Sequence, residues 1–422
     1  MEQIDLLIYG ASQVCVVPGV DGPQRGAQLG ELGLIVDGAV AVHDGRILQT
    51  GYTDDMLRTY QATTAINAAE RAVIPGFVDP HTHLPWYGDR AHEFEQRLAG
   101  ATYMEIMAAG GGIMNTVRQV RQATLDDLVQ DNLPRLRRML QHGTTSAEAK
   151  TGYGLETAVE LKQLEAMMHL GAAQPVEITP TFLPAHAVPP EYAGHTDAYV
   201  DLVVNEMLPA GAAWMAQQGV RLFCDVFCEA GVFDVSQTRR ILETAAALGY
   251  GLKVHADEFE GLGGTKLAVE LGAVSADHLV KTPDADIAAL GQGNTIAVGL
   301  PGTPFGLGHH EYTPARKILA AGGALALATD LNPGTCWCES MQMVMALACR
   351  YLGLTQAQAL AAATINAAYA IGRGQEIGSL EPGKQADLLI LETADYRQLG
   401  YQFGANLVQT VIKKGRVVVG GQ

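Results

Sequence analysis

Two histidines, His81 and His83, stand one residue apart directly after the apolar run 73–79. If they continue an extended strand, the two-residue period of the backbone turns both imidazoles toward the same side. Two neutral imidazoles on one face form the beginning of a Zn²⁺ or Fe²⁺ site. The alternative is a surface loop rich in histidine, and the strand-like run before the pair favours the metal site.

Three more side chains that bind metals or move protons accompany short apolar runs elsewhere. His255 lies near the end of the run 252–256, His278 near the end of the run 274–279, and Asp330 directly follows the run 324–329. A single histidine at a strand end is more often a packed, hydrogen-bonded residue than a ligand. Four imidazoles and a carboxylate at corresponding positions are poorly explained by independent packing, so they indicate one shared site.

Such a shared site requires parallel strands whose carboxyl ends meet. The candidate strands are the runs 72–79, 144–149, 176–183, 222–228, 252–256, 274–279, 295–300 and 324–329. Most are continuously apolar, as expected for strands buried on both faces. Helical patterns lie between them, clearest at 125–141 and 236–248. This alternation predicts an α/β fold with a (β/α)₈ TIM-type barrel, whose functional groups gather at that end; a doubly wound open sheet is the alternative.

The two ends of the chain have a different pattern. Residues 34–47 and 386–419 contain short strand-like pieces joined by Asp-Gly and Lys-Gly turns. Neither end has enough strands to bury a face alone. We therefore expect one small antiparallel domain, a composite β-sandwich of residues 1–70 plus 373–422, beside a barrel of residues 71–372.

The composition of the chain limits the classes of partner that it can bind and the compartment in which it works. The chain has 422 residues, 45 acidic against 28 basic side chains and a formal net charge of −17, which disfavours nucleic acid and anionic membranes as partners. The six cysteines are too irregularly spaced for a disulfide framework. No apolar stretch approaches 18 residues, and the acidic N-terminus does not resemble a secretory signal. These features predict a soluble, cytoplasmic protein.

The motifs resemble those of the metal-dependent amidohydrolase superfamily, and 377–388 (IGSLEPGKQADL) looks like its small β domain. More narrowly, the chain resembles the imidazolonepropionase family. The matching stretches are 88–94 (GDRAHEF), 109–113 (AGGGI), 150–154 (KTGYG), 185–192 (AHAVPPEY), 255–259 (HADEF) and 329–335 (TDLNPGT).

That family opens the ring of 4-imidazolone-5-propanoate with water to give N-formimidoyl-L-glutamate in histidine degradation. The resemblance implies one Zn²⁺ or Fe ion per subunit, held by His81, His83, His255 and Asp330, in a barrel that commonly dimerises. Such an ion lowers the pKa of its bound water and presents hydroxide to the ring carbonyl. His278 would accept the proton of that water, with Asp330 sharing the base role.

The same resemblance implies residues that hold the substrate. Glu258, three residues beyond His255, would bind or protonate the ring nitrogen that leaves; the alternative is a solvated surface acid. The propionate needs a cation, and Arg90 offers a bidentate guanidinium, although an ordinary ion pair with Glu93 or Glu95 is the alternative. By analogy with the family, further contacts come from Tyr153, His186, Asn332, Gly334 and Thr335.

Many amidohydrolases hold two metals bridged by a carboxylated lysine after the fourth strand. Here the fourth run ends in Phe227-Cys228-Glu229-Ala230, without a lysine, so a single ion is expected. Whether Glu229 bridges a second ion, and whether Lys150 serves the substrate carboxylate, stays open. We interpret the remaining candidate histidines as surface or packing residues: His92, His142, His169, His309 and His310.

Three rival functions share these motifs. A purine or pyrimidine deaminase uses much the same metal ligands but leaves Arg90, Tyr153 and His186 without an anion to hold. A hydantoinase-like or dihydroorotase-like hydrolase normally needs the bridging lysine. A catalytically inactive barrel used for binding usually loses ligands, whereas every expected ligand position is filled here.

Overall fold

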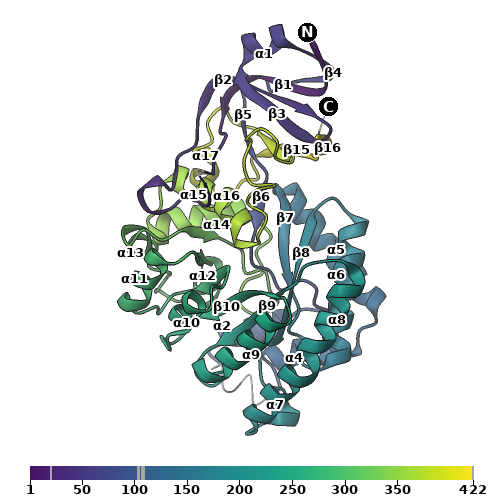
Figure 1. Cartoon of the computed structure of the whole chain (residues 1–422), viewed down its shortest axis with the longest axis vertical. Coiled ribbons are helices and arrows are strands. Elements are labelled where there is room, and N and C mark those ends of the chain that lie inside the picture. Colours follow the sequence, from purple (N-terminus) through teal and green to yellow (C-terminus); the bar gives the residue numbers. More distant parts are fainter. Residues whose placement is uncertain (20, 102–104, 106–109, 421–422) are drawn as a thin grey trace.

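The computed structural model describes residues 1–19, 21–101, 105 and 110–420. Ala109, the first residue of the stretch 109–113, lies outside the described residues. Figure 1 shows a sheet that carries both chain ends, above a larger unit in which helices surround a set of strands.

The larger unit is built on eight parallel strands, each paired with the next along the chain. They are β6 (Phe77–Asp79), β7 (Thr144–Lys150), β8 (Glu177–Ala185), β9 (Phe223–Cys228), β10 (Gly251–Ala256), β11 (Ser275–His278), β12 (Ile296–Gly299) and β13 (Leu325–Leu327). A doubly wound sheet reverses its strand order part-way, and this one does not. The predicted (β/α)₈ barrel is therefore confirmed.

The barrel closes between its first and last strands just above their carboxyl ends. The backbone N–H of Asp330 donates to the carbonyl of His81 at 3.1 Å, and the N–H of His83 donates to the carbonyl of Leu331 at 2.9 Å. The Thr329 hydroxyl donates to Asp79 at 2.6 Å. These bonds join the segment after β6 to the segment after β13, and both segments carry metal-binding side chains.

Helices surround the barrel strands (Figure 1). Those before β10 are α2 (Ala91–Leu98), α4 (Ile113–Gln122), α5 (Leu125–Gln141), α6 (Thr157–Ala173), α7 (Thr196–Leu202), α8 (Leu208–Gln218) and α9 (Val235–Ala247). Those after it are α10 (Gly264–Glu270), α11 (Asp284–Gln292), α12 (Gly302–Leu307), α13 (Ala315–Ala320), α14 (Met341–Leu347), α15 (Gln356–Ala362) and α16 (Ile365–Ala370). Short 3₁₀ helices (Gly26–Gln28, Pro190–Tyr192) and π-helical turns (Val203–Met207, Ala348–Leu352) complete the set.

The two helices predicted from the sequence are present. Helix α5 has the predicted bounds, and Thr124 caps it by accepting a hydrogen bond from the Asp127 N–H. Helix α9 begins and ends one residue earlier than predicted, because Asp234 caps it by accepting from the Gln237 N–H.

The second unit is one sheet assembled from both ends of the chain. Its strands are β1 (Glu2–Val14), β2 (Ile35–His43), β3 (Arg46–Tyr52), β4 (Tyr60–Asn67), β5 (Ala72–Pro75), β14 (Leu388–Leu391), β15 (Val408–Lys413) and β16 (Arg416–Val419). Helix α1 (Thr53–Thr59) packs against it, and α17 (Gln398–Tyr401) lies between β14 and β15 in the chain. The expectation of a purely antiparallel domain is wrong, because β1 pairs in parallel with β4 and β5.

The predicted first barrel strand, 72–79, is in fact two strands. β5 pairs with β14 and β1 in the terminal sheet, whereas β6 starts the barrel. Gly76 lies at the junction, and a Cβ there would collide with the side chain of Thr145. We therefore propose that the boundary between the two units lies at Gly76 rather than at residue 70.

The amino ends of the barrel strands are joined to the terminal sheet by ion pairs. We call this end of the barrel its lower end, and the end that carries the histidines its upper end. Glu177, the first residue of β8, bonds Lys413 at 2.8 Å, Lys414 at 2.6 Å, Gln385 at 2.7 Å and Arg373 at 3.2 Å. Burial opposes ionisation of Glu177, but Lys413 and these hydrogen bonds hold its pKa below its usual range. We call Glu177 and its partners the lower charge cluster.

The cysteines and the helices bear on two further predictions, the lack of a disulfide framework and of a membrane span. All six cysteines are free. Among the described residues, no helix has the length and apolarity needed to cross a membrane.

Candidate metal centre and active site

Four metal-binding side chains meet at the carboxyl ends of the barrel strands, as the sequence predicts. The Nε2 atom of His83 lies 3.3 Å from that of His81 and 3.4 Å from that of His255. The Oδ1 atom of Asp330 lies 3.4 Å from Nε2 of His81 and 3.3 Å from Nε2 of His83. All four side chains are buried. We call this group the metal cup.

The metal cup fits a small divalent ion. Metal–ligand bonds of about 2.0–2.1 Å in a tetrahedral shell place neighbouring ligand atoms about 3.3–3.4 Å apart, as here. Oδ1 of Asp330 is buried and has no hydrogen-bond partner in the described part of the chain, which is costly without a cation nearby. Burial alone would raise the pKa of Asp330, but the close imidazoles of His83 and His278 and the hydroxyl of Thr303 lower it to about 2. The Asp330 carboxylate is therefore ionised.

Two carboxylates in the barrel interior contact imidazoles of the metal cup. Nδ1 of His81 lies 2.7 Å from Asp277, and Nδ1 of His255 lies 2.9 Å from Asp225. The hydrogen bond of His81 favours a proton on its Nδ1, which leaves the Nε2 lone pair for a metal. The Asp225 carboxylate lies close to Nδ1 of His255, but this contact lacks hydrogen-bond geometry. Burial holds the pKa of His81 well below its usual range and lowers that of His255 to about 3, so both imidazoles are neutral ligands.

The sequence analysis missed Asp225 and Asp277. The signal for both was available, because each is an acidic residue inside an otherwise apolar, buried strand. Such residues are almost never fully buried unless they are paired.

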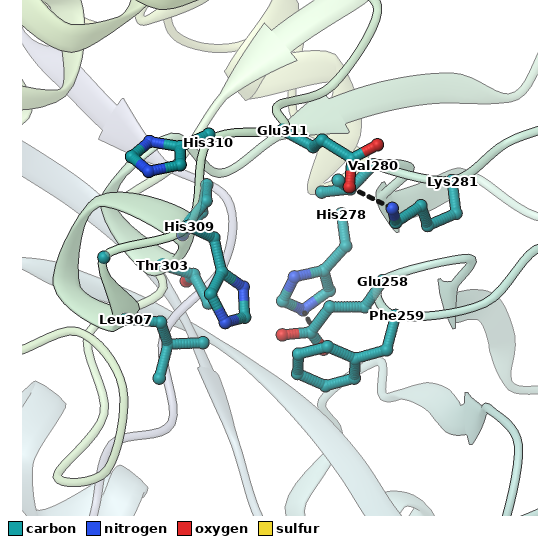
Figure 2. Close-up of a pocket in the computed structure, with 12 residues that line it drawn as sticks. Glu258, Phe259, His278, Val280, Lys281, Thr303, Leu307, His309, His310 and Glu311 are labelled. Atoms are coloured by element: carbon teal, nitrogen blue, oxygen red, sulfur yellow. Dashed lines mark hydrogen bonds and ion pairs between the residues drawn. The ribbon is translucent and has the colours of Figure 1, made fainter. Parts of the chain in front are cut away.

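An acid and a base face each other beside the cup. Nε2 of His278 lies 3.6 Å from Oε2 of Glu258, whose side chain is only 9 % exposed. Figure 2 shows both side chains at a pocket of about 420 Å³, which Thr303 and Phe259 also line. Burial, together with the charges of Asp330 and Glu229, raises the pKa of Glu258 well above its usual range. Burial lowers the pKa of His278 to about 4. Both shifts favour the uncharged forms, a carboxylic acid beside a neutral imidazole.

Glu229 holds the loop that carries Glu258. Its carboxylate accepts hydrogen bonds from the backbone N–H groups of Glu258, Phe259 and Glu260, at 3.1, 2.9 and 3.1 Å. These bonds indicate that Glu229 positions the loop.

Lys150 does not reach the substrate side of the cup. It is fully buried in the barrel interior, with carboxylates of Glu148 and Asp225 at 2.9 and 2.8 Å. Burial opposes its charge, but Asp225, Glu148 and Asp277 raise its pKa above the usual range. Lys150 is therefore a buried ammonium ion rather than a ligand for the substrate carboxylate.

The opposite side of the cup is aromatic. His186 stacks on His83 with ring centroids 4.8 Å apart, and its Nδ1 lies 3.0 Å from the carbonyl oxygen of Gly152. The buried ring of Tyr153 lies 5.4 Å from that of His186 and 6.0 Å from that of His83. Burial and the neighbouring His83 keep the pKa of His186 well below its usual range. The structure thus brings both predicted substrate contacts to the metal centre.

Arg90 forms the ion pair with Glu93 that the sequence analysis gave as an alternative. Its Nε donates to the buried carboxylate of Glu93 at 2.8 Å. Its Nη1 end extends to the loop after β13, where a Cβ on Gly334 would collide with it. Glu93 therefore orients the guanidinium, and glycine at 334 makes room for it.

Asn332 builds the loop that Arg90 approaches. Its Oδ1 accepts from the N–H groups of Gly334 and Thr335, both at 2.8 Å, and its Nδ2 donates to the Asp330 carbonyl at 2.7 Å. The side chain also bonds the Thr335 hydroxyl at 2.9 Å. These contacts indicate that Asn332 shapes the loop next to Asp330 and leave Gly334 and Thr335 nearer the site.

Two histidines interpreted as surface residues lie at the rim of the pocket. His309 and His310 are exposed and line it, and Figure 2 shows the His309 ring facing Glu258 and His278. Phe259 and His309 have ring centroids 6.4 Å apart. His92 and His169 are exposed, whereas His142 is partly buried.

Comparisons with known proteins agree with this geometry. Residues 72–418 match the model of the amidohydrolase family. The imidazolonepropionase of Herpetosiphon aurantiacus is 54 % identical over 99 % of this chain and 98 % of that protein. That of Chloroflexus aggregans is 53 % identical over 99 % of both chains. The chain belongs to the imidazolonepropionase family. It is an amidohydrolase, as the motifs predict.

Solved structures with lower identity share the fold. An adenosine deaminase from Xanthomonas campestris with bound zinc has a TM-score of 0.72 at 20 % identity, over 99 % of this chain and 94 % of that one. Guanine deaminase of E. coli has a TM-score of 0.72 at 15 % identity, over 99 % of both chains. These similarities concern the fold, so the deaminase alternative has no support beyond the shared architecture.

Proposed function

We propose that this protein adds water to 4-imidazolone-5-propanoate and opens its ring to give N-formimidoyl-L-glutamate. Membership of the imidazolonepropionase family supports this reaction. The observation that carries the proposal is the placement of Glu258 and His278 on one side of the metal cup, with Arg90, Tyr153 and His186 brought to the site as well.

We propose one Zn²⁺ or Fe ion per subunit, held by His81, His83, His255 and Asp330. When bound, such an ion acts as a Lewis acid and lowers the pKa of a water molecule at the site. Three imidazoles and a carboxylate suit either metal. The side chain that could have bridged a second ion, Glu229, is engaged by backbone N–H groups.

The protein's own groups complete the hydrolysis. His278, neutral at pH 7, accepts a proton from the attacking water through Nε2. The water oxygen forms a bond to the ring carbonyl carbon, and the bond from that carbon to the ring nitrogen breaks. Glu258, whose protonated form is favoured by burial, donates its proton to that nitrogen, which leaves as part of the amidine. The pKa shifts of both residues match these roles.

Substrate recognition comes from the other residues. The Nη end of Arg90 binds the propionate, while Glu93 holds its Nε. Tyr153 and His186 contact the ring, and Asn332 shapes the loop that presents Gly334 and Thr335. A heterocycle without an anionic tail would leave the Arg90 guanidinium unused.

A turnover assay tests the proposal. Freshly prepared imidazolonepropionate is compared with a panel of heterocyclic amines, and the products are identified by mass. The proposal predicts turnover of imidazolonepropionate to a product with the mass of substrate plus water. Release of ammonia from an amine of the panel, without ring opening of imidazolonepropionate, would favour the deaminase alternative.

We also propose that the protein is a cytoplasmic homodimer. Its six free cysteines suit a reducing compartment. Exposed aromatic side chains on neighbouring segments, Tyr351, Tyr401 and Phe403, are of the kind that subunit interfaces bury. Light scattering of the purified protein tests the dimer, and a monomer at all concentrations would contradict it.

A further inference from the structure

A layer of charged side chains lies in the barrel interior beneath the metal cup. It consists of three carboxylates and two lysines, all fully buried: Glu148, Lys150, Asp225, Lys253 and Asp277. We call these five residues the interior layer. Buried charges are tolerated when they are paired closely, and removing one partner leaves an uncompensated charge.

Lys150 is the centre of this layer. Its Nζ lies 2.8 Å from Asp225, 2.9 Å from Glu148 and 3.6 Å from Asp277. It therefore contacts every carboxylate of the interior layer.

Lys253 occupies the same layer but makes different contacts. Its Nζ bonds Glu148 at 3.0 Å and the carbonyl oxygens of Pro80 and Ala370 at 3.2 Å each. In the described part of the chain it forms no ion pair with Asp225 or Asp277. Lys253 is thus a natural control, since it has equal burial and one shared partner.

The two aspartates that Lys150 contacts are those that touch the metal cup. Asp277 lies 2.7 Å from Nδ1 of His81, and Asp225 lies 2.9 Å from Nδ1 of His255. Asp225 also accepts from the backbone N–H of His255 at 3.1 Å and from that of Val226 at 2.8 Å. Only one carboxylate therefore separates the ammonium of Lys150 from each of these two ligands.

We infer that Lys150 is a positioning residue for the metal centre. Its ammonium group fixes the side chains of Asp225 and Asp277 where they approach Nδ1 of His255 and Nδ1 of His81, at 2.9 and 2.7 Å. The Nε2 lone pairs of both imidazoles then face the metal cup. This inference rests on the proposed metal site, and it assigns a role to a lysine that neither the ligand set nor the substrate contacts use.

The physical reason is the charge balance of the layer. Three carboxylates against two ammonium groups leave one negative charge, and Asp330 adds a second. A divalent ion in the cup neutralises both. Without the ammonium of Lys150, the same volume holds three carboxylates against one lysine. A carboxylate that turns away no longer contacts Nδ1 of its histidine, and loss of such an outer partner typically weakens metal binding 10- to 100-fold.

The test compares Lys150→Met with Lys253→Met in the full-length protein. Each variant is depleted of metal and titrated with Zn²⁺ against a competing chelator, while thermal unfolding reports stability. We expect Lys150→Met to bind Zn²⁺ about 10- to 100-fold more weakly, with a clearly smaller loss for Lys253→Met. Both variants should lose stability, because both remove a buried ion-pair partner.

A double-mutant cycle connects the effect to Asp225. In the Asp225→Asn background, Lys150→Met should add little further loss of Zn²⁺ affinity, whereas the Lys253→Met effect should persist in full. Absorption of the Co²⁺-loaded protein gives an independent readout, and a changed ligand-field spectrum is expected for Lys150→Met only. If Lys150→Met does not fold, Lys150→Gln against Lys253→Gln makes the same comparison, since glutamine keeps donors without charge.

The outcomes separate this inference from the proposed function. If the unaltered protein binds no metal, the proposed metal site itself fails. If the unaltered protein binds Zn²⁺ tightly and the variants at 150 bind it equally well, or lose no more affinity than those at 253, the role of Lys150 is overturned and the metal site stands.

Discussion

The two ends of the barrel use buried charge in opposite ways. At the lower end, Glu177 is surrounded by Lys413, Lys414, Gln385 and Arg373, and its ionised form is fully hydrogen-bonded. At the upper end, Oδ1 of Asp330 has no donor among the described residues. The difference distinguishes a junction between two units from a binding site. Carboxylates that hold the fold together have all their hydrogen-bond partners within the chain, whereas a carboxylate that binds a ligand keeps an oxygen without a partner.

Left-handed backbone occurs at both ends, since Lys414 of the lower charge cluster has φ of 49°. His278 and Asp330 adopt left-handed backbone angles, with φ of 79° and 54°, although neither is glycine. Such conformations cost about 1–3 kcal/mol each and collect at functional sites. The contrast in hydrogen-bond partners predicts that substitutions at the top reduce activity more than stability, and that those at the bottom do the reverse.

The largest effect is expected at Asp330. Asp330→Ala removes a ligand of the metal cup, so kcat/KM should fall by at least about 10³-fold, or roughly 4 kcal/mol. Thermal stability in the metal-free state should be unchanged or higher, because the variant removes an incompletely satisfied buried charge. Bound metal, kcat/KM and Tm are measured together, with the exposed residue variant His92→Ala as control. Retention of full metal content and activity would contradict the assignment.

Glu258→Gln should have the next largest effect. Glutamine keeps the shape of the side chain but has no acidic proton, so kcat should fall by about 10²- to 10⁴-fold while metal content stays intact. Glu260→Gln on the same loop is the matched control, because its exposed side chain lies outside the pocket. Loss of the metal in Glu258→Gln would instead make Glu258 a structural residue.

Arg90→Ala should act on binding. Losing a charged hydrogen bond costs about 1.5–3 kcal/mol, so KM for the propionate substrate should rise about 10- to 150-fold. KM for an analogue with a neutral amide tail should change little. Arg90→Lys should restore only part of the affinity, because an ammonium cannot form the bidentate fork. An equal effect on both substrates would remove the assigned role.

The smallest effect on turnover, and a clear one on stability, is expected at the lower charge cluster. Glu177→Gln should lower the free energy of unfolding by about 1–3 kcal/mol at pH 7, with kcat/KM nearly unchanged. The exposed Glu376, which also pairs with Arg373, is the control, and Glu376→Gln should cost less than about 1 kcal/mol.

The stability difference between wild type and Glu177→Gln should depend on pH, because folding shifts the pKa of Glu177. Folding lowers the pKa of Glu177, so its contribution is complete above the unfolded-state pKa of about 4.3 and is lost as pH falls toward the folded-state value. Urea unfolding at pH 7 and near pH 3 should therefore show the gap between wild type and Glu177→Gln closing on acidification. A gap that widens at low pH would contradict this account.

The same comparison explains what sequence reasoning could find. The ligands His81, His83, His255 and Asp330 were predictable because each ends an apolar run, and the carboxyl ends of barrel strands converge. The lower charge cluster was not, since Glu177 meets Lys413 only after residues 236 positions apart are brought together by two different units.

The division of 72–79 into two strands was also unpredictable because it depends on pairing with a distant part of the chain. The run is continuously apolar, and only pairing of its first half with the distant β14 reveals the break at Gly76. The roles of Asp225 and Asp277 could not be predicted for another reason. An acidic residue in a buried strand can be recognised from the sequence, but the partners of these two lie on other segments of the barrel.

A metal titration of the metal-depleted protein, followed by ring opening of imidazolonepropionate, tests the central claim most directly. The account predicts recovery of activity that rises linearly and stops at one ion per chain, with no recovery in Asp330→Ala. Full activity without metal, or a break at two ions per chain, would contradict it.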